Sequence, residues 1–338
     1  MAQSFRPEPA ESVGFITNYR CTFQCKHCLY CSSPKIQEKI DESAIREIID
    51  QIDHVLGKVF LHLGGGEPLI HFPLIKKVLS YLRKTRIIVE YLETNGSFLA
   101  TDTISKLEAL KNAGLDCLLL SISPFHNEFT PVREVKRMVH DIVSVFGQRG
   151  IFPWHPGFLR FLEKVSVEDT IPLETYFNVF SPSEILYQLT SVMYIHPGGR
   201  GAYLLAKHLP CHPPDVLLHE DCEASLRSSV HAHIDYNGNY LTGFCSGLRI
   251  GKQTGFDLNK LYKEGVILSH YPLLDILVNK GLKGLYELGR KEGYVPQPQG
   301  YVSPCHLCLD VRLHLYLHVD RYEELYPSFF YEDLRSLK

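Results

Sequence analysis

Apolar residues in the first half of the chain follow two alternating patterns. Short β-branched and aliphatic runs predict strands over 13–17, 59–63, 87–92 and 117–122. Between them, apolar residues recur at helical spacing, which predicts helices over 41–56, 73–83, 101–113 and 131–149. Strands that alternate with helices predict a parallel sheet, and this number of units indicates a full or partial barrel. We therefore expect an α/β fold with a partial (β/α)6 TIM-like barrel, including a later strand over 191–195.

The pattern changes after about residue 205. Two short apolar runs, 230–235 and 240–244, flank Tyr-Asn-Gly-Asn and predict a β-hairpin. Two modest helices are expected between 272 and 291, and a further helix after residue 305, with Asp320 near its end. We expect two domains, a partial barrel over 12–204 and a small cysteine-rich α+β extension over 205–320.

Composition narrows the class of protein. The chain has 338 residues, 35 Lys+Arg against 38 Asp+Glu, and a formal charge of −3. Because nucleic-acid binding needs clustered positive charge, no nucleic-acid partner is expected. The first twelve residues lack the apolar stretch of a signal peptide, and no membrane span is expected. A cytoplasmic protein with ten cysteines is expected to use them as ligands or catalysts rather than in disulfides.

Three of the cysteines, Cys21, Cys25 and Cys28, follow the first predicted strand. Three thiolates so close in the chain can hold three corners of an iron–sulfur cube and leave the fourth iron open. The same spacing fits a tetrahedral zinc site completed by Cys31 or His27. Spacing alone leaves both interpretations open.

The pattern Cys-x-x-x-Cys-x-x-Cys, with Gly65-Gly66-Glu67-Pro68 after the second strand, resembles the radical S-adenosylmethionine (radical SAM) enzymes. The resemblance extends over roughly residues 13–200. It implies a [4Fe–4S] cluster on Cys21, Cys25 and Cys28, with S-adenosylmethionine on the open iron. It further implies an external electron donor, such as a flavodoxin or ferredoxin, and a 5′-deoxyadenosyl radical that abstracts a substrate hydrogen atom.

Further polar motifs follow the predicted strands and should meet at the carboxyl end of the sheet, where barrel enzymes build their sites. Gly65 and Gly66 allow the backbone to approach a ligand, and Glu67 can accept a hydrogen bond from the methionine ammonium of SAM. The remaining cofactor-binding candidates resemble family motifs: Thr94 and Asn95, Ser121 and Ser123, and Arg200. Each also has a purely structural interpretation, as a strand-exit turn, a turn serine or a surface arginine. His126 is a candidate for proton transfer or substrate contact, with a structural histidine as the alternative.

A second group of cysteines comprises Cys222, Cys245, Cys305 and Cys308. Their arrangement resembles the twitch and SPASM extensions of radical SAM enzymes, which implies a second, auxiliary [4Fe–4S] cluster. A full SPASM domain carries more cysteines, so one auxiliary cluster is the economical number. Zinc is again the alternative, and Cys211 could replace Cys222 as a ligand.

Two remaining cysteines, Cys31 and Cys211, are candidate donors of a hydrogen atom to a substrate radical. This expectation comes from a similarity to radical SAM peptide epimerases. Those enzymes have two adjacent cysteines where this chain has Phe244-Cys245-Ser246. Cys117 begins a buried strand and is expected to be a small apolar residue.

The resemblance implies an enzyme that modifies a ribosomally made peptide or protein by epimerisation, crosslinking or oxidation. One alternative is a small-molecule radical SAM oxidoreductase of cofactor or natural-product biosynthesis. The other is a non-catalytic zinc or iron–sulfur binding module, which would not bind SAM.

Overall fold

The computed structural model describes residues 3–154, 169–187, 196–227, 230–243, 245–251, 256–319 and 322–338. The chain divides into two compact units. The first, here called the sheet unit, comprises Gly14–Cys25 and Ser32–Ile195. The second, here called the C-terminal unit, comprises Met1–Val13, Lys26–Cys31 and His196–Lys338.

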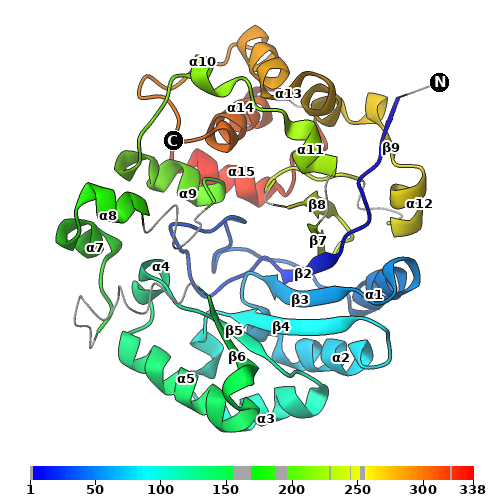
Figure 1. The fold of residues 1–338 in the computed structure, drawn as a ribbon, viewed down its shortest axis with the longest axis vertical. Coiled ribbons are helices and arrows are strands. Elements are labelled where there is room, and N and C mark those ends of the chain that lie inside the picture. The colour runs from blue at the N-terminus through cyan, green and yellow to red at the C-terminus, as the bar shows by residue number, and fades with distance from the viewer. Residues whose placement is uncertain are drawn as a thin grey trace. The chain divides into compact units, whose positions relative to one another are not determined.

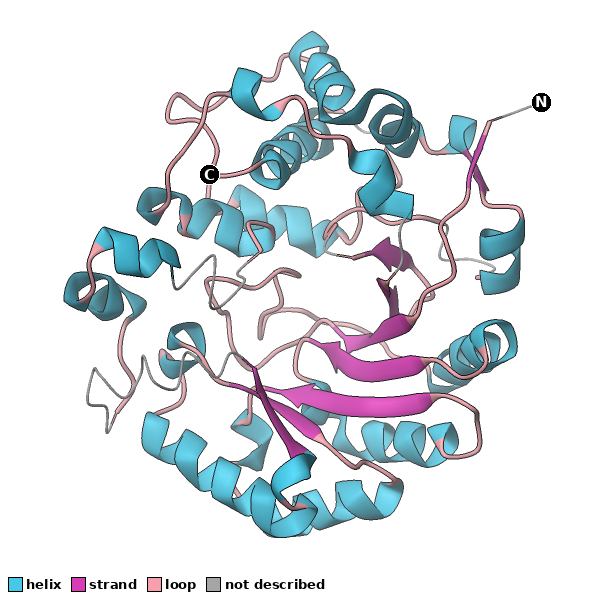
Figure 2. Cartoon of the chain, viewed as in Figure 1, coloured by secondary structure: helices cyan, strands magenta, loops and turns pink. Residues whose placement is uncertain are grey.

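The sheet unit is built from strands that alternate with helices (Figures 1 and 2). Its strands run in the order β6-β5-β4-β3-β2, and the pairs from β3 to β6 are parallel. Strand bounds are β2 (Ser12–Asn18), β3 (Phe60–Gly65), β4 (Ile88–Thr94), β5 (Leu118–Ser121) and β6 (Ile151–Trp154). Helix bounds are α1 (Glu42–Leu56), α2 (Phe72–Leu82), α3 (Thr103–Ala113), α4 (Pro124–Asn127), α5 (Val132–Phe146), α7 (Leu173–Val179) and α8 (Pro182–Tyr187). The α/β partial-barrel class is therefore confirmed, and the described strands do not close into a barrel.

Local sequence explains where these elements begin and end. The side chain of Asp41 accepts a 2.9 Å hydrogen bond from the Ser43 amide and caps α1. The four isoleucines of α1, Ile45, Ile48, Ile49 and Ile52, are all buried and form its apolar face. Helix α3 ends at Gly114, whose φ of 110° is a left-handed conformation that glycine adopts without strain. Helix α1 therefore follows from a capping residue and one apolar face, and α3 ends where glycine permits a left-handed turn.

Two parts of the sheet unit differ from the sequence prediction or lie beyond it. Strand β6 and helices α7 and α8 were not predicted. Strand β6 has only four residues and includes Pro153, so it lacks the length and alternation that mark a strand. The strand expected over 191–195 lies outside the described residues.

The C-terminal unit contains the predicted hairpin, in which β7 (His231–Asp235) pairs antiparallel with β8 (Tyr240–Thr242). A second antiparallel pair joins β1 (Ser4–Phe5) to β9 (Val266–Ile267). Helix bounds are α9 (Gly199–Leu204), α10 (Pro214–Leu217), α11 (Cys222–Arg227), α12 (Leu258–Lys263), α13 (Pro272–Lys291), α14 (Pro304–His318) and α15 (Ser328–Arg335). Gly281 breaks α13 with φ 60° and ψ −158°, which accounts for the two helices expected there. Asp320 lies outside the described residues.

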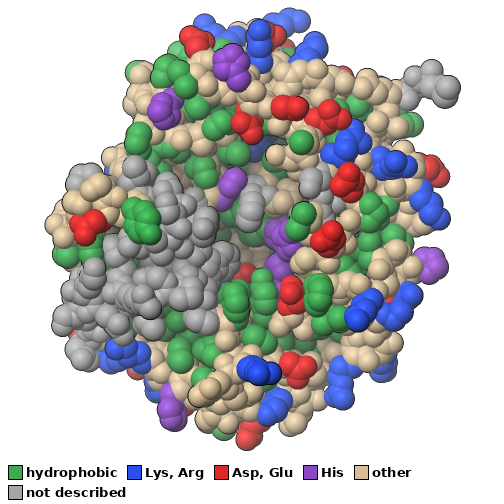
Figure 3. All heavy atoms as spheres, viewed as in Figure 1, with side chains coloured by type: hydrophobic (Ala, Val, Ile, Leu, Met, Phe, Trp, Pro, Cys, Tyr) green, Lys and Arg blue, Asp and Glu red, His purple; other side chains and the backbone are tan. Residues whose placement is uncertain are grey.

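Charged side chains of both signs are scattered over the face shown in Figure 3. The small formal charge of −3 thus results from mixed acidic and basic groups. No helix within the described ranges has the length and apolarity that a bilayer crossing requires.

Candidate functional site

The glycines at the end of β3 approach the backbone that follows β2. The Gly66 amide donates to the Asn18 carbonyl at 2.8 Å, and the Glu67 amide donates to the Arg20 carbonyl at 2.9 Å. A Cβ atom on Gly66 would lie 2.1 Å from the Arg20 carbonyl oxygen. Gly65 has a φ of 127°, which side chains rarely tolerate. Backbone packing therefore requires glycine at both positions.

The carboxylate of Glu67 is completely buried and organises the ends of two strands. Its Oε1 accepts hydrogen bonds from Thr94 Oγ1 at 2.8 Å and from the Leu69 amide at 3.1 Å. Its Oε2 accepts a 2.8 Å hydrogen bond from the Asn95 amide. These contacts tie the Gly-Gly-Glu segment to the Thr-Asn-Gly segment, so the Glu67 side chain is engaged inside the protein.

Glu93, at the end of β4, lies near Glu67. Burial raises the pKa of Glu67 to about 7. Burial, followed by the negative charge of Glu67, raises the pKa of Glu93 to about 8. The two carboxyl groups therefore titrate close to neutral pH.

Asn95 connects the strand ends to the cysteine triad. Its Nδ2 donates to the sulfur of Cys21 at 3.4 Å and to Thr22 Oγ1 at 3.0 Å. The amide of Phe23 also donates to the Cys21 sulfur at 3.4 Å. Donors of this kind stabilise a thiolate ligand and tune a cluster that it holds. The structure thus links Glu67, Asn95 and Cys21 in one chain of contacts within the sheet unit, where Cys25 is also buried.

The serine candidates occupy the end of β5 and the turn that follows it. Ser121 is the last residue of β5 and is buried. Ser123 caps the short helix α4, and its Oγ lies 2.6 Å from Nδ1 of His126. The Ser123 hydroxyl and the His126 ring are therefore partners, and each restricts the other's orientation.

In the C-terminal unit, the third cysteine of the triad packs against the start of α9. The Arg200 amide donates to the Cys28 carbonyl at 3.1 Å. A Cβ atom on Gly199 would lie 2.3 Å from the same carbonyl, and Gly199 has a φ of 51°. The Pro-Gly-Gly-Arg-Gly segment therefore fixes the backbone of Cys28.

Arg200 is 1% exposed, so it is not a surface arginine. Its Nε donates to Oδ2 of Asp333 at 2.7 Å, which makes an ion pair that is buried on the Arg200 side and 14% exposed on the Asp333 side. The thiol of Cys31, also 1% exposed, hydrogen-bonds to Asp333, and burial raises the pKa of Cys31 well above its usual range. Sequence reasoning did not identify Asp333, because no local motif surrounds it.

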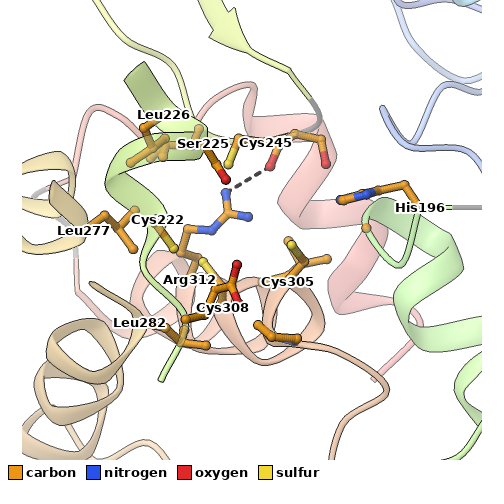
Figure 4. Close-up of a pocket in the computed structure, with 16 residues that line it drawn as sticks. His196, Cys222, Ser225, Leu226, Cys245, Leu277, Leu282, Cys305, Cys308 and Arg312 are labelled. Carbon is orange, nitrogen blue, oxygen red and sulfur yellow. Dashed lines mark hydrogen bonds between the residues drawn. The ribbon is translucent and has the colours of Figure 1, made fainter. Parts of the chain in front are cut away.

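The second group of cysteines lines one cavity of about 80 Å³ in the C-terminal unit. Cys222 comes from α11, Cys245 follows β8, and Cys305 and Cys308 come from the first turns of α14. Figure 4 shows their side chains around this cavity. Burial raises the pKa of Cys245 to about 11, and burial followed by the neighbouring thiols raises that of Cys222 further.

Arg312 also lines this cavity and was missed in the sequence. It lies on α14, and Figure 4 shows its guanidinium among the four cysteines. The sequence could have identified it, because residues spaced as Cys305, Cys308 and Arg312 lie on the same face of a helix.

The other cysteines lie elsewhere. Cys211 does not line the cavity, and its sulfur lies 3.7 Å from the Ala206 carbonyl. Cys117 is half-buried rather than fully buried. The structure therefore brings together Cys222, not Cys211, with the other three thiols of the second group.

Comparison with solved structures finds distant similarities. BtrN in complex with AdoMet and 2-DOIA is 12% identical, with 82% of this chain and 90% of that chain covered and a TM-score of 0.46. Native anSMEcpe with bound AdoMet is 12% identical, with 97% of each chain covered and a TM-score of 0.45. Streptococcus suis SuiB bound to precursor peptide SuiA is 14% identical, with 90% of this chain and 76% of that chain covered and a TM-score of 0.38. No curated protein matches the chain.

A family model described as the Radical SAM superfamily matches residues 15–145. The matched segment contains the cysteine triad, Glu67, Asn95 and Ser121. The match to this superfamily model supports an enzyme and implies a [4Fe–4S] cluster and S-adenosylmethionine. The resemblance predicted from the triad and the Gly-Gly-Glu segment is thus confirmed, and residues 15–145 are similar to the Radical SAM superfamily.

Proposed function

We propose that this protein abstracts a hydrogen atom from an unactivated C–H bond in a ribosomally made peptide or protein. The contact chain from Glu67 through Asn95 to the Cys21 sulfur carries the proposal. It joins the three segments that radical SAM chemistry needs at one place in the sheet unit. The peptide substrate follows from the resemblance to SPASM and twitch enzymes.

Cys21, Cys25 and Cys28 would hold the [4Fe–4S] cluster, which, when bound, supplies the electron that cleaves SAM. Glu67 fixes the Asn95 backbone, and the Asn95 side chain donates to the Cys21 sulfur. The residues proposed to bind SAM are Gly65, Gly66, Glu67, Thr94, Asn95, Ser121, Ser123 and Arg200. A flavodoxin or ferredoxin is the proposed electron donor.

A second [4Fe–4S] cluster is proposed on Cys222, Cys245, Cys305 and Cys308. The cavity of about 80 Å³ supports it, since one water needs only roughly 10–15 Å³ by the same measure. A single Zn²⁺ bound about 2.3 Å from four sulfurs would not require this much room. All ten cysteines are free thiols, and a reducing, cytoplasmic location is proposed because such a compartment keeps thiols reduced.

Cys211 is the better of the two proposed hydrogen-atom donors. It is half-buried, whereas Cys31 is 1% exposed and its thiol is hydrogen-bonded to Asp333. His126 is retained as a proposed proton-transfer or substrate-contact group, held by Ser123.

The central test is anaerobic reconstitution with iron and sulfide, followed by dithionite and SAM. We expect 5′-deoxyadenosine from the wild type, none from Cys25→Ala, and wild-type amounts from the control Cys117→Ala. Intact clusters without any 5′-deoxyadenosine would instead support the metal-binding module. Full SAM cleavage by Cys25→Ala would contradict the ligand assignment.

The substrate class needs its own test. Candidate peptides encoded near the gene would be incubated with the reconstituted enzyme in D2O and analysed by mass spectrometry. Deuterium incorporation indicates epimerisation, and a mass decrease indicates crosslinking or oxidation. Turnover of small molecules alone would favour the cofactor or natural-product alternative.

A further inference from the structure

Arg312 occupies the same face of α14 as two thiols of the second group. Cys305, Cys308 and Arg312 are spaced at i, i+3 and i+7, so their side chains project from one side of the helix. All three line the cavity in Figure 4. A permanent positive charge is therefore built into the thiol site.

The guanidinium is held firmly in this position. Arg312 is 4% exposed, and its Nη1 donates to the Ser246 carbonyl at 2.9 Å and to the Tyr331 hydroxyl at 3.2 Å. The Ser246 carbonyl directly follows Cys245 in the chain. The Nε atom is buried and has no hydrogen-bond partner among the described residues.

The groups that act on Arg312 and become negative when they ionise are the Tyr331 hydroxyl and the thiols of Cys308 and Cys245. Burial disfavours its charge, but Tyr331, Cys308 and Cys245 outweigh burial, so the pKa of Arg312 is raised. Cys308 also accepts a hydrogen bond from the Arg312 side chain. Glu220 lines the cavity as well, and its charge acts on Cys222 and Cys305. His196 is the other titratable side chain at the cavity, and burial lowers its pKa.

This arrangement has a direct electrostatic consequence for a redox group. A buried charge without a counter-charge costs several kcal/mol, so Arg312 needs anionic groups in the cavity. A thiolate-ligated cluster is anionic and gains one more negative charge when it is reduced. A fixed cation nearby stabilises the reduced form more than the oxidised form, because it faces more negative charge there.

We infer that Arg312 raises the reduction potential of the auxiliary centre and so fits it to accept an electron. The inference rests on the proposed auxiliary cluster. Arg312 is here a positioning residue, since it acts on the cluster through its charge and through Cys308. The competing interpretation is purely structural, in which Arg312 only joins the segment after Cys245 to Tyr331 on α15.

The test uses the full chain carrying Cys21→Ala, Cys25→Ala and Cys28→Ala, which leaves the auxiliary centre alone. Three further versions of this chain carry Arg312→Gln, Arg312→Lys or the exposed control Arg335→Met. Gln keeps a donor for the Ser246 carbonyl but removes the charge, whereas Lys keeps the charge and loses the planar fork. Iron content and a dithionite titration followed by electron paramagnetic resonance are measured for each.

We expect Arg312→Gln to lower the equilibrium constant for one-electron reduction by about tenfold, which is about 59 mV toward more negative potential. Arg312→Lys and Arg335→Met should stay close to the parent. Equal potentials in the parent and Arg312→Gln would overturn this inference and leave the auxiliary cluster standing. Equal shifts in Arg312→Gln and Arg312→Lys would favour the structural interpretation and also overturn it. Absence of cluster iron from the parent would overturn the auxiliary cluster together with the inference.

Should Arg312→Gln fail to fold, Arg312→Lys and Tyr331→Phe decide. Tyr331→Phe removes one hydrogen bond to Arg312 without changing its charge, so the potential should remain near that of the parent. A large shift in Tyr331→Phe with none in Arg312→Lys would assign the effect to hydrogen bonding and overturn the role of charge.

Discussion

Asp333 on α15 pairs with Arg200 on α9 through a 2.7 Å hydrogen bond from Nε to Oδ2. The same carboxylate hydrogen-bonds to the thiol of Cys31. The Arg200 amide also donates to the Cys28 carbonyl. Asp333 therefore helps, through Arg200, to fix the backbone at Cys28. One acidic residue far along the chain thus helps to place a thiol near its start.

Replacing Asp333 should therefore destabilise the protein strongly. Asp333→Asn leaves the buried guanidinium of Arg200 without a counter-charge, which costs about 3–5 kcal/mol of unfolding free energy. The neighbouring Glu332→Gln is the control, because Glu332 is 54% exposed and its pair with Arg335 is 3.8 Å long. Such a surface pair is worth about 0–1 kcal/mol. Urea unfolding of the reduced, metal-free protein measures both, and equal midpoints would refute the role given to Asp333.

The cavity distinguishes the two candidates for the fourth auxiliary ligand. Cys222→Ala should lose the iron of the proposed auxiliary cluster, whereas Cys211→Ala should retain it, because Cys222 lines the cavity and Cys211 does not. Iron and sulfide analysis after anaerobic reconstitution measures the difference. Iron loss from Cys211→Ala alone would reverse the assignment.

Two glycines of the same strand region should respond differently to alanine. In Gly66→Ala the new Cβ would meet backbone atoms of Arg20 at 2.1 Å, so the segment must move. In Gly64→Ala the nearest atom is Oε2 of Glu93 at 3.2 Å, a flexible carboxylate that can give way. We expect Gly66→Ala to lower the unfolding free energy by more than about 2 kcal/mol and Gly64→Ala by less than about 1 kcal/mol. Thermal and urea unfolding of the two variants provide the comparison, and similar losses would contradict the close approach.

Glu93 and Glu67 should make the stability of the sheet unit depend on pH. Their pKa values, about 8 and about 7, lie above the unfolded value of 4.5. The protonated forms are thus favoured by folding, so this contribution is present below pH 4.5 and is lost as pH rises through 7 to 8.

Removing one of these carboxyl groups should flatten that dependence. Glu93→Gln stays neutral at every pH, so unfolding free energy should fall less between pH 5 and 8 than in the wild type. Glu90→Gln on the same strand is the control, because Glu90 is exposed. If the unfolding free energy of Glu93→Gln changed with pH as steeply as that of the wild type, Glu93 would not contribute to the pH dependence.

The fold was predictable wherever a short pattern determined an element. In α1, Asp41 caps the helix and the isoleucines form its buried face. The Tyr-Asn-Gly-Asn segment indicates the hairpin turn. Strand β6 carries neither signal, since it is short and contains Pro153. Sequence patterns of this kind extend over a few residues. They do not indicate which distant segments of the chain come into contact.

The same limit explains what sequence reasoning found and missed at the site. Cysteine and glycine motifs can be recognised in a sequence from their chemistry and spacing. Arg312 and Asp333 are single charged residues in helices, and a charged residue in a helix is usually exposed. Only tertiary packing reveals that Arg312 is buried, that Asp333 is mostly covered and that each faces a thiol.

The four thiols around Arg312 come from three separate segments, α11, the loop after β8, and the start of α14. Any group that binds all four would cross-link these segments and restrict the unfolded chain. Loss of that group in air would remove the cross-link and open the unit to proteases. Oxidative damage to any such group would thereby shorten the lifetime of the polypeptide itself.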